Sequence, residues 1–172
     1  MRIVLFLLVF PLLSTMVFAQ HKTSKEISSA EIRFEFVSKK VKGTIEGFES
    51  QSIIDWENPE KSVFEGSVQS ETLDTNNGLR NWSLRSGKYF DTDDYPKIYF
   101  KSSNVRLVED KLLVEGNLTI KSISKKMTIS FQRKGQQLIG TTSLYSLDYG
   151  IKIKKNRADN LVNIKMIFTL SD

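Results

Sequence analysis

The chain has 172 residues, a formal net charge of +5 and no cysteine. This length fits one domain with a substantial core. The lack of cysteine excludes disulfides, thiol nucleophiles, thiolate zinc sites and lipidation on cysteine. Because the charges are spread along the chain, we attribute the basic excess to solubility and expect no nucleic-acid partner.

The first residues have the pattern of a secretory signal peptide. Arg2 precedes an apolar run over residues 3–13, and small or aliphatic residues lead up to Ala19. The run is shorter than the roughly 20 residues that cross a bilayer, and Pro11 interrupts it. We therefore expect residues 1–19 to be cleaved from a periplasmic or secreted protein.

The next segment, residues 20–29, is polar and contains the only histidine, His21, so we expect a flexible tail there. Beyond it, alternating apolar residues and turn signals predict eight strands. They are expected at about residues 31–36, 42–56, 62–73, 97–108, 112–120, 126–133, 137–147 and 161–170. Gly43 and Gly47 mark points where the second strand bends or bulges. The pattern indicates one all-β domain over residues 30–172, an extended antiparallel barrel of eight strands.

One stretch departs from this alternation. Leu79, Trp82 and Ser86 recur at helical spacing behind the candidate N-caps Asn76 and Asn77. We predict a short helical insert at about residues 76–90, lying over one end of the barrel.

Several motifs in and after this insert resemble those of the YceI-like family of periplasmic, polyisoprenoid-binding, lipocalin-like proteins. The motifs are Leu73-Asp74-Thr75-Asn76, Arg80-Asn81-Trp82-Ser83-Leu84-Arg85-Ser86, Tyr89-Phe90-Asp91, Tyr95-Pro96, Phe100-Lys101-Ser102, Gly116-Asn117-Leu118-Thr119-Ile120 and Asp148-Tyr149-Gly150. They occur in order over nearly the whole chain after residue 19. The resemblance implies a lipocalin-like barrel around a tunnel for a polyisoprenoid chain, with isoprenoid quinones among the candidate ligands.

The expected tunnel lining is almost entirely apolar. It comprises Phe34, Phe36, Ile45, Phe64, Val68, Leu84, Phe90, Ile98, Phe100, Leu118, Ile120, Phe131, Ile164 and Phe168. Such an interior suits a long hydrocarbon, which gains about 0.8 kcal/mol per buried methylene. The same alternation would equally describe a filled core without a ligand.

Two arginines of the insert are candidates for a headgroup contact or a gate. Arg80 matches the arginine of the family, but Asn81 and Ser83 replace the acid and the histidine that usually follow. An equally weighted alternative gives Arg80 a buried structural role, a hydrogen bond or an ion pair, with Asp74 or Asp148 as candidate partners. Arg85 lies five residues further on, so it points in a different direction on a helix.

The leading interpretation is an exported, non-catalytic lipid carrier without cofactor or metal. Transient membrane contact and homodimerisation are compatible with it. A nucleophilic triad is disfavoured because no cysteine, and no histidine outside the tail, is available. The alternative is a filled barrel that binds an acidic partner through a basic surface. That surface would comprise Lys39, Lys40, Lys152, Lys154 and Lys155, the last three within a basic segment, residues 151–157, interpreted as an exposed hairpin.

Overall fold

The computed structural model describes residues 24–171, so the predicted signal peptide, residues 1–19, lies outside the described residues. The strands are β1 (Ser24–Phe36), β2 (Val41–Ile45), β3 (Glu49–Ser50), β4 (Ile53–Asp55), β5 (Glu65–Gln69), β6 (Lys97–Val108), β7 (Lys111–Ile120), β8 (Ile123–Lys134), β9 (Gln137–Tyr145) and β10 (Leu161–Leu170). The single α-helix among these residues is α1 (Gly78–Arg85). Short 3-10 turns lie at Val37–Lys39, Pro59–Lys61, Ser70–Thr72, Ser146–Tyr149 and Arg157–Asn160.

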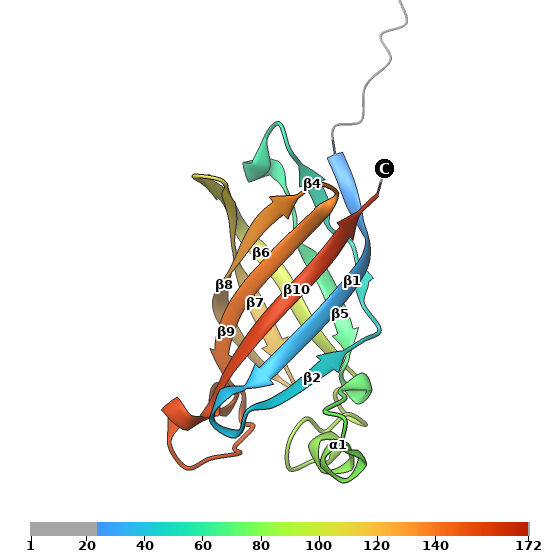
Figure 1. Cartoon of the computed structure of the whole chain (residues 1–172), viewed down its shortest axis with the longest axis vertical. Coiled ribbons are helices and arrows are strands. Elements are labelled where there is room, and N and C mark those ends of the chain that lie inside the picture. The colour runs from blue at the N-terminus through green and yellow to red at the C-terminus, as the bar shows by residue number, and fades with distance from the viewer. Residues whose placement is uncertain (1–23, 172) are drawn as a thin grey trace, which may run out of the picture.

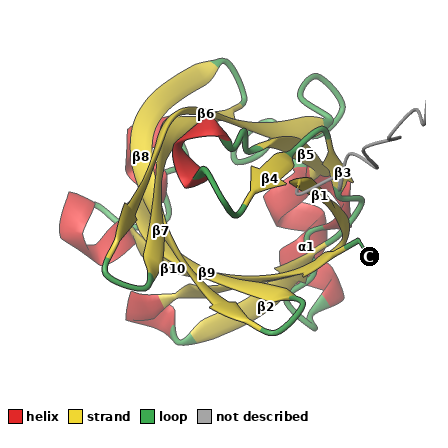
Figure 2. Cartoon of the chain, turned by 90° about the horizontal axis from the view of Figure 1, so that it is seen from above, coloured by secondary structure: helices red, strands yellow, loops and turns green. Residues whose placement is uncertain are grey.

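The strands form one antiparallel sheet that curls into a barrel (Figure 1). Neighbouring strands follow the order β2-β1-β10-β9-β8-β7-β6-β5-β3, and β4 pairs with β1. Seen from above, they form a ring (Figure 2). The all-β barrel expected from the alternation is therefore confirmed.

The strand predicted at residues 42–56 is divided into β2, β3 and β4 and closes this ring. It bends at Gly47, whose φ of 69° favours glycine. β2 pairs with β1, and β3 pairs with β5. β4 then returns to the start of β1, while Ile53 bridges to Val63. Counted as one bent strand, this segment completes the predicted set of eight.

The start of β1 corrects the expected tail. Residues 24–29 belong to the strand, with Ser24–Glu26 paired to β4 and Ile27 opposite Leu170. The polar composition was misleading because only Ile27 of this stretch is buried. A bulge between Ile27 and Ser29 also shifts the register, so the inward positions change from odd to even numbers.

Helix α1 lies at one end of the barrel, opposite the C-terminus (Figure 1). Of the two candidate caps, Asn77 is the N-cap, since its side chain accepts a hydrogen bond from the Arg80 amide at 2.9 Å. The helix buries none of its residues. Leu79 and Trp82 are 77% and 71% exposed, so their helical spacing marks an outer face.

The barrel is packed solid at the end opposite α1. Buried side chains from the strand ends fill it: Ile27, Ile54, Val105, Leu112, Val114, Leu138 and Leu170. Within residues 24–171, no helix has the length and apolar character needed to cross a bilayer. The half of the barrel nearer α1 is instead hollow.

Candidate functional site

A cavity of about 610 Å³ occupies the half of the barrel nearer α1. This volume lies within the range of about 300–1,000 Å³ that is typical of small-molecule sites. The structure places all fourteen residues predicted for the tunnel on its wall: Phe34, Phe36, Ile45, Phe64, Val68, Leu84, Phe90, Ile98, Phe100, Leu118, Ile120, Phe131, Ile164 and Phe168. Contact between these residues and a ligand remains a prediction. The cavity contradicts the alternative of a filled barrel.

Glycines in the strands make room for the aromatic rings of the wall. A Cβ built on Gly43 would lie 2.5 Å from the ring tip of Phe34, the residue opposite it. A Cβ on Gly140 would lie 2.4 Å from Phe131, again directly opposite. Each ring therefore occupies the space that a side chain on the neighbouring strand would fill, and it lies along the wall. Gly43 thus serves close approach and is not a bend.

Four phenylalanines form the floor of the cavity. Phe48 stacks on Phe168 and Phe64 stacks on Phe131, each pair with ring centroids 5.1 Å apart. Phe131 and Phe168 join the two pairs at 5.5 Å. All four rings line the cavity, whereas the buried aliphatic residues beyond them do not. The cavity therefore ends at this stack.

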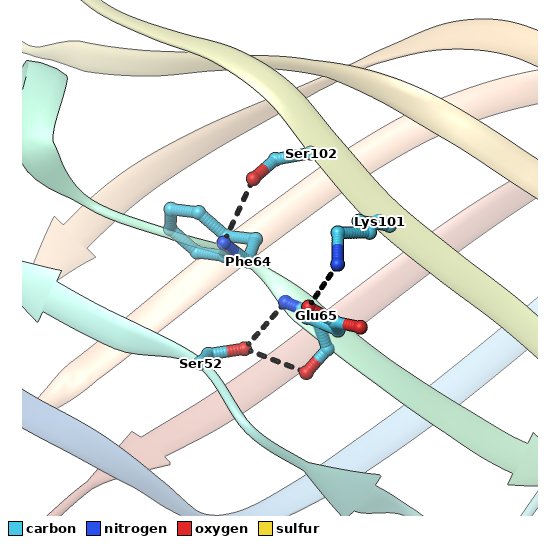
Figure 3. A network of polar contacts seen from close by, with 5 residues as sticks. All are labelled: Ser52, Phe64, Glu65, Lys101 and Ser102. Atoms are coloured by element: carbon cyan, nitrogen blue, oxygen red, sulfur yellow. Dashed lines mark hydrogen bonds and ion pairs between the residues drawn. The ribbon is translucent and has the colours of Figure 1, made fainter.

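Two serine hydroxyls hold Phe64 and Glu65 at the start of β5 (Figure 3). The Phe64 amide donates to Ser102 Oγ at 3.0 Å, and the Ser102 amide donates to the Phe64 carbonyl at 2.8 Å. On the other side, Ser52 Oγ accepts from the Glu65 amide at 3.0 Å and donates to the Glu65 carbonyl at 3.1 Å. These bonds replace regular strand pairing where β6 bulges and β3 ends.

The loop over residues 151–160 forms part of the wall and corrects the expected exposed hairpin. Ile151 and Ile153 line the cavity, and Ile151 is buried. Asn160, which is fully buried, shapes the loop: its Oδ1 accepts from the amides of Ile153 and Lys154. Its Nδ2 donates to the carbonyls of Lys154 and Asn156.

The structure adds further apolar wall residues that the predicted set missed: Ile32, Val41, Phe48, Leu73, Tyr89, Met127, Ile129, Leu144, Val162 and Met166. Several share the alternation of predicted neighbours, and this signal could have found them. Met127 and Ile129, for example, precede Phe131 at period two in β8.

The two candidate arginines are in different settings. Arg80 is exposed and lines the cavity, whereas Arg85 is not on its wall. Within residues 24–171, the Arg80 guanidinium forms no ion pair with either expected aspartate. Asp74 instead accepts from the Asn81 side chain and the Asn76 amide, and these hydrogen bonds lower its pKa.

The second expected partner, Asp148, is also engaged elsewhere. The Arg157 guanidinium donates to both of its carboxylate oxygens, at 2.7 and 2.6 Å, and lowers the pKa of Asp148. Beside it, burial and then the Asp148 charge raise the pKa of Tyr149 to about 12, so this phenol stays protonated at neutral pH. In the part of the chain that the structure describes, no three histidine, cysteine or carboxylate side chains gather as a metal site.

Comparison with known proteins gives both sequence relatives and structural neighbours. Protein YceI of Salmonella newport is 28% identical over 121 residues, covering 69% of this chain and 63% of that protein. A UPF0312 protein of Photorhabdus laumondii is 31% identical over 94 residues, covering 55% of this chain and 49% of that protein. The chain thus spans about half to 63% of the length of these curated relatives.

Two solved structures share the fold. BcnA of Burkholderia cenocepacia has a TM-score of 0.72 at 17% identity, covering 83% of this chain and 96% of BcnA. A polyisoprenoid binding domain from Saccharophagus degradans, described as implicated in plant cell wall breakdown, has a TM-score of 0.58 at 11% identity. That match covers 87% of this chain and 98% of the domain.

A match to a protein family covers the entire barrel. A family model for the YceI-like domain matches residues 20–170. The motifs of the insert, the barrel topology and this match agree, and the protein belongs to the YceI-like family.

Proposed function

We propose that this protein is an exported, non-catalytic carrier that binds a polyisoprenoid or another long-chain lipid in its cavity. The observation that carries this proposal is the hollow half of the barrel, with its almost continuous apolar wall. A five-carbon isoprene unit would gain about 4 kcal/mol in such a wall, at about 0.8 kcal/mol per carbon. The Saccharophagus domain of the same fold, described as polyisoprenoid binding, supports this ligand class, and isoprenoid quinones are among the candidates.

The polar groups of the wall also favour a hydrocarbon. Most of its hydroxyls already bond within the protein. Ser52 bonds with Glu65, Thr75 Oγ1 donates to Asn81 Oδ1 at 2.7 Å, and Ser146 Oγ donates to a carbonyl of the 151–160 loop at 2.9 Å. Their hydroxyl protons are therefore not free to donate to a polar substrate.

The outer face of α1 offers a route for loading. The exposed Leu79 and Trp82 lie on the same helix as Arg80 and Leu84, which line the cavity. An exposed tryptophan beside arginines suits the interface of an anionic bilayer. We infer that this face touches the membrane while lipid enters or leaves.

A blocking substitution tests the carrier. Val68 lines the cavity opposite Ile98, while the next residue of β6, Tyr99, is 49% exposed. Val68→Trp puts a large side chain into the cavity, and Tyr99→Trp is the matched control outside it. By native mass spectrometry, we expect the wild type and Tyr99→Trp to take up added isoprenoid quinone or to purify with lipid. Folded Val68→Trp should bind at least about tenfold less, which corresponds to about 1.4 kcal/mol.

Two outcomes would count against the proposal. Repeated detergent-free preparations without lipid or uptake would remove the carrier function, and unchanged binding by Val68→Trp would show that lipid does not occupy this cavity. Export has its own measurement. The intact mass of protein from the periplasmic fraction should match a chain that starts at Gln20. Full-length protein found in the cytoplasm would contradict export.

A further inference from the structure

The formally charged residues on the cavity wall are Lys39, Arg80 and Glu65. Only the two cations are available to a ligand. Glu65 opposes Lys101 in the pairing of β5 with β6, and the Glu65 carboxylate lies 2.9 Å from the Lys101 ammonium (Figure 3). Lys101 is 68% exposed and is next to the cavity-lining Phe100, so this ion pair lies on the outer surface.

Lys39 and Arg80 belong to the same end of the barrel. Lys39 ends the turn between β1 and β2, and Arg80 projects from α1, which lies beyond that end (Figure 1). Within residues 24–171, neither side chain forms an ion pair with an acidic residue. Both are exposed, in contrast to the phenylalanine floor at the other end of the cavity. The cavity is therefore apolar in depth and cationic at its opening.

A second cation stands beside Lys39. The turn at Val37–Lys39 meets the 151–160 loop, where Ser38 Oγ donates to the Asp159 carbonyl at 2.7 Å. This contact places the Lys39 ammonium against that of Lys154, which lowers the pKa of Lys39. Two adjacent ammonium groups repel each other, and an anion near them would relieve that repulsion.

We propose that the ligand is an amphiphile with an anionic headgroup, a carboxylate or a phosphate, held at the cavity opening by Lys39 and Arg80. This inference rests on the proposed carrier function. A hydrogen bond between charged groups is about twice as strong as one between neutral groups. A guanidinium can donate two parallel hydrogen bonds to either a carboxylate or a phosphate. A neutral headgroup would gain no such attraction, because these exposed cations would stay paired with water.

Matched lipids test the headgroup separately from the chain. The probes are geranylgeranyl monophosphate against geranylgeraniol, and palmitate against hexadecanol, measured by isothermal titration of the whole protein at low ionic strength. We expect the anion to bind about tenfold more tightly than the alcohol in at least one pair. The pair with the larger ratio identifies phosphate or carboxylate as the headgroup. Added salt should reduce the ratio because it screens these exposed charges.

Substitutions assign the preference to these residues. The double variant Lys39→Gln/Arg80→Gln should bind each anion about as weakly as its alcohol, so that the ratio of the two affinities falls to about one. Lys40→Gln/Arg85→Gln is the matched control, since both residues are charged neighbours that lie off the wall. It should keep the wild-type preference.

The outcomes separate the two proposals. Equal binding of anions and alcohols to the wild type would overturn the anionic headgroup and leave the carrier in place. A preference that survives Lys39→Gln/Arg80→Gln would also overturn it. Failure of all four lipids to bind, with isoprenoid quinone still taken up, would overturn the anionic headgroup alone, and failure of the quinone as well would remove both proposals.

Discussion

Replacing Gly140 with alanine tests whether the rings of the wall depend on the glycines opposite them. The new Cβ would lie 2.4 Å from Phe131 Cε1 and 2.8 Å from Cδ1, closer than a methyl group can approach. Phe131 has little room to retreat, because it is 1% exposed, stacks on Phe64 and packs at a tilt against Phe168. The change therefore forces a ring of the cavity floor out of its position.

Two opposing terms set the expected loss of stability. Overpacking a core costs typically about 1–3 kcal/mol, whereas replacing glycine stabilises by about 0.4–1 kcal/mol through the unfolded chain. We expect a net loss of roughly 1–2 kcal/mol for Gly140→Ala. For a chain of this size, that loss corresponds to a fall in Tm of about 2–8 °C.

Thermal unfolding followed by circular dichroism measures this change. Gly78→Ala is the matched control, because a Cβ at Gly78 meets no atom within 4 Å. It should leave Tm unchanged or raise it slightly, since alanine favours the helix. Adding Phe131→Leu to Gly140→Ala should cost less than the two separate changes combined. Equal Tm values for Gly140→Ala and Gly78→Ala would refute the proposed packing of rings against glycines.

Two further predictions concern the surface. Leu79→Ser/Trp82→Ser should weaken co-sedimentation with anionic vesicles about tenfold or more, because it removes the apolar face of α1. Leu107→Ser changes an exposed residue near the opposite end of the barrel and should not weaken co-sedimentation. Equal loss of co-sedimentation in both variants would contradict membrane contact through α1. Arg157→Gln should lower Tm at pH 7 by removing the partner of Asp148. Arg157 lowers the pKa of Asp148 in the folded protein. The stabilisation from this ion pair is therefore present above about pH 3.9, the ordinary pKa of an aspartate, and disappears as pH falls through the folded-state pKa of Asp148. Thermal unfolding of the wild type and Arg157→Gln between pH 7 and pH 2 should thus show a difference in Tm that narrows at low pH. A constant difference in Tm would assign the effect to the contact of the Arg157 guanidinium with the Tyr145 ring.

The inward face of the barrel could be predicted because strand side chains alternate with a period of two. The alternation that points Ile98 and Phe100 inward also predicts Leu118 and Ile120 inward on the next strand, and all four line the cavity. The helix boundary was also readable, since Asn77 has a side chain that caps the first turn.

Other features depend on contacts that alternation does not encode. The bulge between Ser102 and Asn104 reverses the inward positions of β6, so that Val105 becomes buried. Ile151 is held at the cavity by Ser146, which bonds both its amide and its carbonyl, while Asn160 holds the backbone at Ile153 and Lys154. Alternation also cannot separate a hollow barrel from a filled one, because both repeat every second residue. Here the difference depends on how rings pack against glycines in neighbouring strands.

The aromatic floor closes one end of the cavity, which leaves the end near α1 as the opening. A molecule with a long tail can enter such a blind pocket only tail first, and it must leave in the reverse order. In the proposed carrier, an acceptor would therefore meet the polar end of the ligand before any hydrocarbon is released. Transfer would then begin with an exchange of charged or polar contacts at the cavity opening. The hydrocarbon chain would follow without entering bulk water if the acceptor stays bound to α1.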